Sequence, residues 1–511
     1  MRFIFRYKKE IGIGIILTVV YFIFRLIYLD RLPIFTDEAI YVRWAQIALN
    51  DASWRFISLT DGKQPLFIWF SMIFMKFVQD PLIAGRLVSV FSGFLTMIGI
   101  YALTYELFRK KTIALFSSIL YIFYPFAQVL DRMALMDSMV GTFSVWALYF
   151  SVLLVRKIKL NIAYTLGFVI GAGVLTKTSN FFSIYLLPST LILFDFKKKP
   201  LLPRFIKWIF FVFLSSLIAY GFYAILRLSP LFEMISTKNA TFVYPFSEWI
   251  KHPFLYFISN FSGLFSWLLQ YLTPSYIVLL LLSIFLINKF FKEKILLFLY
   301  FALPFIALAL FGIKIYPRFI FFMSLMLLPL IAWSLDLIME ELKRFFSRNA
   351  IYIKVTQFVL LLIVIAYPAY TSIIFAKESL SASIADADHG QYVNSWAAGW
   401  GVKDSIAFFS DQAKNQKIFV ATEGTFGLMP EAMEIYLIKN KNIIIKGYWP
   451  VDSFPKEVLD FASKMPTYFV FYQPQHVVLP ISFPLNLVFE VKQGNTNYFY
   501  RVYRVVSSKH Q

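Results

Sequence analysis

The sequence predicts a multi-spanning α-helical membrane protein of about eleven transmembrane helices with a small C-terminal α/β domain. Three observations support this fold class. The 511 residues are 59% hydrophobic and only 15% charged, whereas globular proteins average about 45–50% apolar and 25% charged residues. Apolar runs of about 20 residues recur along the chain, which is the length that crosses a bilayer. After residue 373 these runs give way to shorter strand and helix signals.

The first apolar segment begins at the N-terminus, in "MRFIFRYKKEIGIGIILTVVYFIF". A basic head followed by an apolar run is typical of a signal peptide, but no small-x-small cleavage site follows. We therefore expect an uncleaved first span whose basic end is cytoplasmic.

Thirteen apolar segments can be distinguished, near residues 11–29, 65–79, 83–107, 112–128, 138–155, 160–176, 179–194, 205–227, 254–272, 274–290, 295–312, 319–338 and 351–373. Five basic clusters lie between them: Arg109/Lys110/Lys111, Arg156/Lys157/Lys159, 197–199 with Arg204 and Lys207, Lys289/Lys292/Lys294, and Lys343/Arg344/Arg348. Lysine and arginine are enriched in cytoplasmic loops. All five clusters lie on the same side of the membrane as the N-terminus only if two of the thirteen segments do not cross it.

The two segments chosen are 65–79, which is short and contains Lys76, and 254–272, which is polar and precedes Pro274. We expect both to lie at the outer interface or to re-enter from it. Eleven spans then remain in a membrane domain of residues 1–373, with a first outer loop at 30–82. Thirteen spans would put two basic clusters outside, against the positive-inside bias.

The tail, 374–511, is expected to be an extracytoplasmic α/β domain of a plasma-membrane protein. "KIFVATE", "NIIIKGYW", "TYFVFYQ" and "YFYRVYRV" are rich in β-branched and aromatic residues and predict strands. "PEAMEIYLI" and "PKEVLDFASKM" predict helices that begin near Pro430 and Pro455. Trp396 and Trp400, four residues apart, are interpreted as one face of a further helix packed on the membrane portion, in preference to a sugar platform.

The net charge of +20 is a feature shared with nucleic-acid-binding proteins. The basic residues instead lie in the clusters between apolar runs, and the tail has no basic patch interleaved with aromatics, so we expect no nucleic acid. The chain contains no cysteine, which excludes a disulfide framework.

Asp37 and Glu38 are adjacent acids in the first outer loop, in "LPIFTDEAIYVRWAQ". One interpretation is local: Thr36 caps an amphipathic helix, and both acids favour its positive end. The other is catalytic, because two acids beside a membrane cavity exceed what a helix cap requires.

A second acidic site is in "LDRMALMDSMVGTF", where Asp131 and Asp137 flank the outer end of a span. A carboxylate at the start of apolar sequence is costly unless it faces a cavity or a partner. The alternative to a functional Asp137 is an interfacial acid paired with Arg132.

Two cationic sites lie on the same outer side. Lys177, in "GVLTKTSNFF", is expected in a tight turn between spans, where the alternative role is a lysine that snorkels to the interface. Tyr316 and Arg318, in "GIKIYPRFIFF" with Lys314, lie at a span end stiffened by Pro317. An arginine there can fork onto phosphate, or Tyr and Arg can simply anchor the span.

Together these residues predict one outer cavity with carboxylates on one side and cations on the other. Such a site suits transfer from a phosphate-bearing lipid, because a carboxylate can deprotonate the acceptor while cations stabilise the leaving phosphate. Other chemistries lack their motifs: the four histidines show no metal spacing, and no G-x-S-x-G elbow or dinucleotide fingerprint is present.

Six motifs occur in an order that resembles the GT-C superfamily of glycosyltransferases: "FTDEAIYVRWAQ", "DGKQPLFIWF", "AGRLVSVFSGFLTMIGIYALTYELF", "RMALMDSMVGTF", "GAGVLTKTS" and "YPRFIFFMSLMLLPL". The closest resemblance is to the dolichyl-phosphate-mannose–protein mannosyltransferases and their bacterial relatives, including the lipid A aminoarabinose transferase. It covers roughly residues 10–375.

This resemblance implies inverting transfer of a sugar from a polyprenyl-phosphate donor to an acceptor outside the membrane. It implies that Asp37 is the base or orients the acceptor, that Glu38 and Asp137 are its acidic neighbours, and that Lys177 and Tyr316–Arg318 lie near the lipid phosphate. The chain departs from the family at Gln64, where Pro is usual, and at Phe319, where Tyr is usual. Because superfamily members differ in their use of a divalent metal, metal dependence stays open.

The acceptor stays open as well: a lipid, a protein or a glycan. The tail lacks the repeat domain of the eukaryotic enzymes, and we expect it to support acceptor binding without an essential catalytic group. Two other classes compete with the glycosyltransferase. A transporter or flippase of lipid-linked sugar predicts repeat symmetry and broken helices at midplane. A non-catalytic receptor leaves the outer acids without a role.

Overall fold

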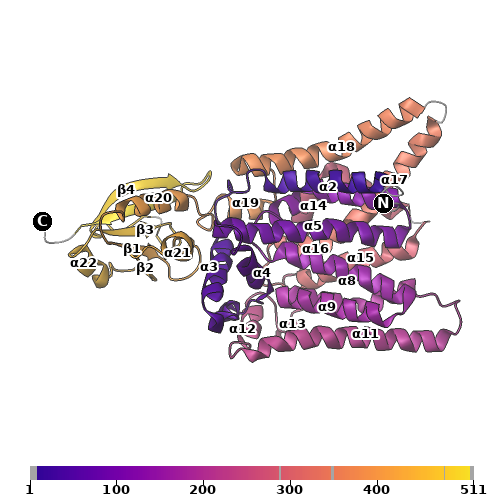
Figure 1. The fold of residues 1–511 in the computed structure, drawn as a ribbon, viewed down its shortest axis with the longest axis horizontal. Helices are drawn as coiled ribbons and strands as arrows, with labels where there is room; N and C mark the ends of the chain where they lie inside the picture. The colour runs from indigo at the N-terminus through magenta and orange to yellow at the C-terminus, as the bar shows by residue number, and fades with distance from the viewer. Residues whose placement is uncertain (1–7, 287–288, 347–349, 477, 507–511) are drawn as a thin grey trace.

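The computed structural model describes residues 8–286, 289–346, 350–476 and 478–506. The basic head at residues 1–7 and Arg348 lie outside the described residues. The chain forms a bundle of long helices with a smaller sheet-containing domain at one end (Figure 1). The start of the first described helix lies toward the opposite end of the bundle (Figure 1).

Within these described ranges, seven helices are long and apolar enough to cross a membrane: α5 (Pro81–Phe108), α8 (Asp137–Lys157), α11 with its 3₁₀ extension (Leu201–Leu228), α14 (Phe257–Phe285), α15 (Phe291–Phe311), the segment that ends in α17 (Pro317–Phe345) and α18 (Ala350–Lys377). Three shorter apolar helices accompany them: α6 (Lys111–Phe123), α9 (Leu160–Thr176) and Thr178–Leu193, which contains α10 (Phe182–Tyr185). With α2 (Lys8–Leu26), the bundle matches the expected number of about eleven. The chain is a multi-spanning helical membrane protein.

The two segments expected not to cross behave differently. Segment 65–79 contains only the nine-residue α4 (Leu66–Phe74), which packs against the amphipathic α3 (Thr36–Asn50) at the end of the bundle. Segment 254–272 is not separate: it joins the next predicted span in the single helix α14. The chain kinks at Thr273, whose φ is 62°, because Pro274 supplies no backbone N–H, and then continues as a helix.

Short helices connect the spans: α7 (Pro125–Leu130), α12 (Met234–Ala240) and α13 (Phe246–Trp249), while α16 (Phe321–Ser324) is the first α-helical turn of the span that ends in α17. Ion pairs place several basic clusters at the same end of the bundle. Lys111 pairs with Glu10 near the start of α2 at 3.0 Å. Arg156 of the second cluster pairs at 3.2 Å both with Glu106 near the end of α5 and with Glu293, which lies between Lys292 and Lys294 at the start of α15. These basic clusters and the start of α2 therefore share one end, opposite the sheet domain (Figure 1).

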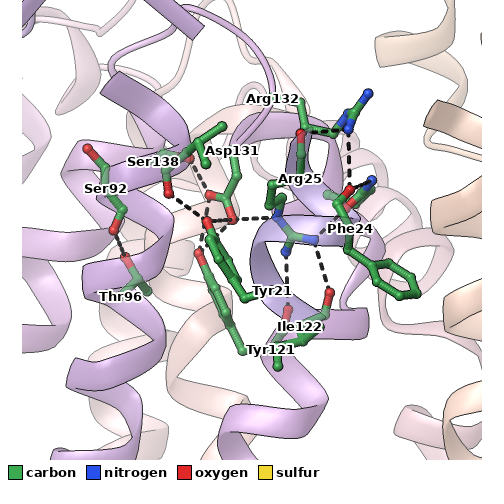
Figure 2. A network of polar contacts seen from close by, with 12 residues as sticks. Tyr21, Phe24, Arg25, Ser92, Thr96, Tyr121, Ile122, Asp131, Arg132 and Ser138 are labelled. Atoms are coloured by element: carbon green, nitrogen blue, oxygen red, sulfur yellow. Dashed lines mark hydrogen bonds and ion pairs between the residues drawn. The ribbon is translucent and has the colours of Figure 1, made fainter. Parts of the chain in front are cut away.

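A buried polar network ties α2 to its neighbours in the bundle (Figure 2). Arg25 Nε donates to Asp131 Oδ2 at 3.0 Å, and both side chains are fully buried. Tyr121 and Ser138 donate their hydroxyls to the same carboxylate at 3.0 and 2.5 Å. Each charge is paired and hydrogen-bonded, which is the condition for tolerating it among apolar helices. Asp131 therefore serves to hold neighbouring helices of the bundle together.

The C-terminal domain contains a five-stranded sheet of order β2-β1-β3-β5-β4. Its strands are β1 (Ile418–Glu423), β2 (Ile443–Tyr448), β3 (Thr467–Phe471), β4 (Leu485–Lys492) and β5 (Phe499–Val505). β1 pairs in parallel with β2 and with β3, and the β3–β5 and β5–β4 pairs are antiparallel. Its helices are α19 (Asp386–Tyr392), α20 (Val402–Gln412), α21 (Glu431–Leu437) and α22 (Lys456–Ala462).

The four predicted strands and both predicted helices of this domain are present, and the edge strand β4 was not predicted. The expectation that Trp396 and Trp400 form one face of a helix is wrong. Both tryptophans lie in the loop between α19 and α20, because Gly401, with a φ of 84°, starts α20 only after them. Trp396 is 40% exposed.

The buried pair in Figure 2 leads to a stability prediction. The Asp131→Asn variant leaves the Arg25 charge without its counter-ion, and such a loss costs about 3–5 kcal/mol in a buried pair. Thermal unfolding in detergent should show this loss. The double variant Arg25→Met/Asp131→Asn should unfold at a higher temperature than the single variant, because the unpaired charge is gone. Equal or lower stability of the double variant would contradict this account.

Candidate active site

The acidic loop is fixed to the bundle through Glu38, whose side chain is fully buried with that of Arg86. Two nitrogens of Arg86 donate to the two Glu38 oxygens, each at 2.8 Å. The backbone N–H groups of Phe35 and Ala134 donate to the same carboxylate at 3.0 and 2.7 Å. Glu38 thus joins the start of α3 to α5 and to the loop before α8.

Asp37 faces the other way, toward cations from distant parts of the chain. Arg318 Nη1 lies 2.8 Å from Asp37 Oδ2, and Lys63 Nζ lies 3.5 Å from Oδ1. The three side chains retain between 11% and 19% exposure. The expectation that Thr36 caps α3 is wrong: the helix begins after Phe35, and the Thr36 hydroxyl donates to the carbonyl of Ala397 at 3.1 Å.

Lys177 and Asp137 form the neighbouring pair, with Nζ 2.7 Å from Oδ1. The Lys177 ammonium also lies 4.8 Å from the centre of the Phe319 ring, so the residue that replaces the family's usual tyrosine contacts a cation. The alternative expectation, that Asp137 pairs with Arg132, is wrong. Arg132 donates instead to backbone carbonyls at the end of α2, including those of Arg25 and Ile27.

Lys63 was missed by the sequence analysis, although its motif "DGKQP" was recognised. It lies in a turn closed by Gly62, whose φ is 64°, and its ammonium lies 3.4 Å from Asp61. The next residue, Gln64, donates to the Thr178 hydroxyl at 2.6 Å and so joins this turn to the Lys177 turn. The family's usual proline could not make this side-chain hydrogen bond.

The Tyr316–Arg318 segment enters from the start of the span that ends in α17. The Arg318 guanidinium lies 5.4 Å from the centre of the Tyr316 ring and 5.7 Å from that of Phe35. Its Nε is buried and has no hydrogen-bond partner within the described part of the chain, so a donor remains for a ligand. Lys314 is exposed outside this cluster.

Two residues that follow the last span complete the wall behind Arg318. Tyr392 packs edge-on against the Phe35 ring, with centroids 4.9 Å apart. Asp388 is fully buried and accepts the Tyr271 hydroxyl at 2.6 Å. Neither residue was predicted, because no periodic pattern or motif marks "IADADHGQY".

The charges of the site act on each other strongly. Burial raises the pKa of Asp37, but the nearby Lys63 and Arg318 outweigh this effect and hold it well below its ordinary value. Burial raises the pKa of Asp388 to about 7, against the lowering effects of the Tyr271 hydroxyl and the Arg318 charge. Asp37 is therefore charged throughout the neutral range, whereas Asp388 titrates within it.

The acids at this site have cations as neighbours, which is a poor donor set for a metal ion. Over residues 8–506, apart from 287–288, 347–349 and 477, no group of three or more His, Cys, Asp or Glu side chains is arranged to hold a metal ion. All six residues predicted for the site lie at this one end of the bundle. Asp37, Asp137, Lys177, Arg318 and Tyr316 form one connected cluster, while Glu38 supports it from behind.

Comparison with protein families gives a match to the dolichyl-phosphate-mannose-protein mannosyltransferase family over residues 62–222, less than half of the chain. No curated protein sequence matches the chain.

Solved structures match over most of the chain. ArnT from Cupriavidus metallidurans in the apo state has a TM-score of 0.60 at 14% identity, over 98% of this chain and 99% of that one. The same protein bound to undecaprenyl phosphate gives 0.57 at 13% identity, with the same coverage. The Archaeoglobus fulgidus oligosaccharyltransferase, tethered with an acceptor peptide, gives 0.51 at 12% identity, over 92% and 70%. The chain has the GT-C glycosyltransferase fold.

The raised pKa of Asp388 gives a pH-dependent prediction. The folded protein favours the protonated acid, so wild-type stability falls as the pH rises from about 4, the unfolded value, to about 7. Asp388→Asn removes this penalty while keeping an acceptor for Tyr271. The free energy of unfolding of the variant should exceed that of the wild type by up to about 4 kcal/mol at pH 8, and by much less at pH 5. Thermal unfolding in detergent at both pH values measures it. The exposed Asp386→Asn is the control, and an equal gain at both pH values would refute the assignment.

Proposed function

We propose that this protein is an inverting glycosyltransferase of the plasma membrane that moves a sugar from a polyprenyl-phosphate donor to an acceptor on the outer face. The observation that carries the proposal is the Asp37 carboxylate held between Arg318 and Lys63, with the Lys177–Asp137 pair beside it. A base surrounded by cations suits a reaction in which a proton is taken up while a phosphate leaves.

In the proposed reaction, Asp37 takes the proton of the acceptor hydroxyl. The acceptor oxygen bonds to the anomeric carbon as the bond from that carbon to the phosphate oxygen breaks. The electron pair leaves with the polyprenyl phosphate, whose added negative charge Arg318, Lys63 and Lys177 stabilise. A single displacement places the acceptor on the opposite face of the sugar, so the anomeric configuration inverts.

The existing ion pairs give donor binding a second effect. Before the donor arrives, Arg318 and Lys63 neutralise Asp37 and lower its pKa, which makes it a weak base. A phosphate that engages these cations withdraws part of their stabilisation from the Asp37 carboxylate. Asp37 then holds a proton more tightly, so the base becomes stronger only when the donor is present.

The other acids have different proposed roles. Glu38 is a positioning residue, because Arg86 and two backbone N–H groups occupy its oxygens. Asp137 orients Lys177 through their 2.7 Å ion pair. No step is assigned to a metal ion, since each of these carboxylates already has cationic or backbone partners.

The proposed topology follows from the ends of the bundle. Several basic clusters meet at one end, and lysine and arginine favour the cytoplasmic side. The site and the C-terminal domain lie at the opposite end, which would then be extracytoplasmic. A transporter or flippase of lipid-linked sugar is the alternative function. The charged residues gather at one end of the bundle, whereas transporter sites lie near the midplane, and this arrangement favours the transferase.

The functional test supplies purified protein with radiolabelled polyprenyl-phosphate sugars and a membrane extract as acceptor source. Transfer of label to the extract is expected. Asp37→Asn should reduce the rate by about 10²–10⁴ while donor binding persists, because the amide cannot accept the proton. Glu38→Gln should instead lower the stability of the protein. If Asp137→Asn abolishes transfer while Asp37→Asn stays active, Asp137 is the base.

Topology can be tested with single thiols, because the chain contains no cysteine. Lys198 lies exposed in the loop before α11, and Lys441 lies exposed in the C-terminal domain. An impermeant thiol reagent applied to intact cells should label Lys441→Cys and leave Lys198→Cys unlabelled until the cells are opened. The reverse result would invert the proposed orientation.

A further inference from the structure

The carboxyl ends of the parallel strands in the C-terminal domain meet the start of α3. β1 ends at Glu423 and is flanked by β2 and β3, both parallel to it. In open α/β sheets, the crevice at the carboxyl ends of such strands is the usual ligand site, at the strand where neighbours lie on both sides. Here that edge faces the loop that carries Asp37.

The first loop at this edge follows β1 and reaches the bundle through Gly427. A Cβ atom at Gly427 would lie 3.5 Å from the Thr36 methyl group. The adjacent Phe426 lies 6.1 Å from the Trp44 ring of α3, and it is nonetheless 49% exposed. The chain thus keeps a large aromatic ring partly in the open against Trp44 of α3, on the loop whose next residue contacts Thr36, the residue before Asp37.

The second loop connects α19 with α20 and binds the backbone on both sides of Phe35. Thr36 N donates to Ala397 O at 3.0 Å, and Gly399 N donates to Ile34 O at 2.8 Å. Trp396, next to Ala397, is 40% exposed, and its ring lies 6.2 Å from that of Tyr472 just after β3. A second open aromatic ring therefore flanks the Asp37 loop.

Both loops are held in place. The α19–α20 loop is held by its bonds to the backbone around Phe35 and by Trp400 Nε1, which donates to Val393 O at 2.7 Å. The Glu423 carboxylate fixes the segment after β3, which carries Tyr472 beside Trp396, by accepting the backbone N–H groups of Tyr472, Gln473 and Gln475 at 3.0 to 3.2 Å. Glu431, at the start of α21, accepts Gly427 N at 3.1 Å. The exposed rings thus stand on rigid supports, which favours binding because little order has to be created when a ligand arrives.

We propose that Trp396 and Phe426 form a platform that binds a sugar ring of the acceptor, so that the acceptor is a saccharide and not a protein hydroxyl. The inference rests on the proposed transferase activity and names the acceptor class of that same site. An exposed aromatic ring offers a flat apolar face to the C–H side of a sugar, while nearby polar groups receive its hydroxyls. The position beside Thr36 places the bound sugar next to the base.

Exposed aromatic residues in a membrane protein have another common use, as anchors among lipid headgroups. Two features favour the saccharide. Both rings lie on loops that contact the catalytic segment, and those loops belong to a domain that extends beyond the end of the bundle (Figure 1). An aromatic anchor needs only to lie at the depth of the lipid headgroups. Its function does not require a position beside the base.

The test measures saccharide binding directly, so that it does not depend on transfer. The full chain in lipid nanodiscs, free of sugar detergents, is titrated with mannotetraose and chitotetraose, and saturation-transfer NMR reports bound sugar. We expect binding of at least one of them and an affinity at least tenfold weaker in Trp396→Ala/Phe426→Ala. Trp396→Phe and Phe426→Tyr should retain it. Trp54→Ala is the matched control: Trp54 is 45% exposed but lies beyond the far end of α3, a helix of about 22 Å.

Each outcome decides between the alternatives. Binding of neither saccharide by the wild type, or equal binding by the double alanine variant, would overturn the proposal. So would a double variant that loses only its affinity for sugar-free vesicles, which would show an anchor. If saccharide binds at the platform but no polyprenyl-phosphate sugar is consumed by the wild type, the proposed transferase fails while the platform stands. A transferase that glycosylates a serine peptide as well as it glycosylates saccharides would also refute the acceptor class.

Discussion

The buried ion pair between Glu38 and Arg86 fixes the loop that carries Asp37 to the end of the bundle that faces the sheet domain (Figure 1). Arg86 also donates to the carbonyl of Leu29, so the pair links the segment after α2, the start of α3 and the first turns of α5. Two charges without water are tolerated there because every oxygen of Glu38 has a donor. The adjacent residue, Asp37, consequently has one direction left, toward Arg318.

This constraint separates two acids that look alike in the sequence. Adjacent residues at the start of a helix point about 100° apart, so Glu38 faces the bundle while Asp37 faces the cations. The buried acid holds the loop, and the partly exposed one remains available to a substrate. The proposed chemistry at Asp37 thus depends on a neighbour that takes no part in it, and loss of Glu38 or Arg86 would change the candidate site through the loop.

The sequence predicted the membrane fold, four of the five strands and six residues that lie together at one end of the bundle, because apolar length, basic clusters and strand composition are local signals. The sequence could not show which of these residues contact each other, because Asp37 and Arg318 are far apart in the chain and no local pattern relates them. Lys63 was not predicted as a site residue, because a single lysine in a short turn gives no recognisable sequence pattern. Trp396 and Trp400 have helical spacing, but the backbone of Gly401 overrides it, and the edge strand β4 is too exposed to give a clear hydrophobic signal.

The boundary expected near residue 374 separates two folds, yet it does not separate the site. Tyr392 packs on Phe35, and the backbone around Ala397 pairs with the strand-like residues before α3. Arg43 of α3 adds an ion pair to Glu434 of α21 at 2.7 Å. The C-terminal domain therefore holds the loop of Asp37 from outside as Arg86 holds it from within. In the proposed reaction, a base clamped from both sides would keep its orientation when a donor phosphate engages Arg318 and Lys63, and this is when that reaction needs it.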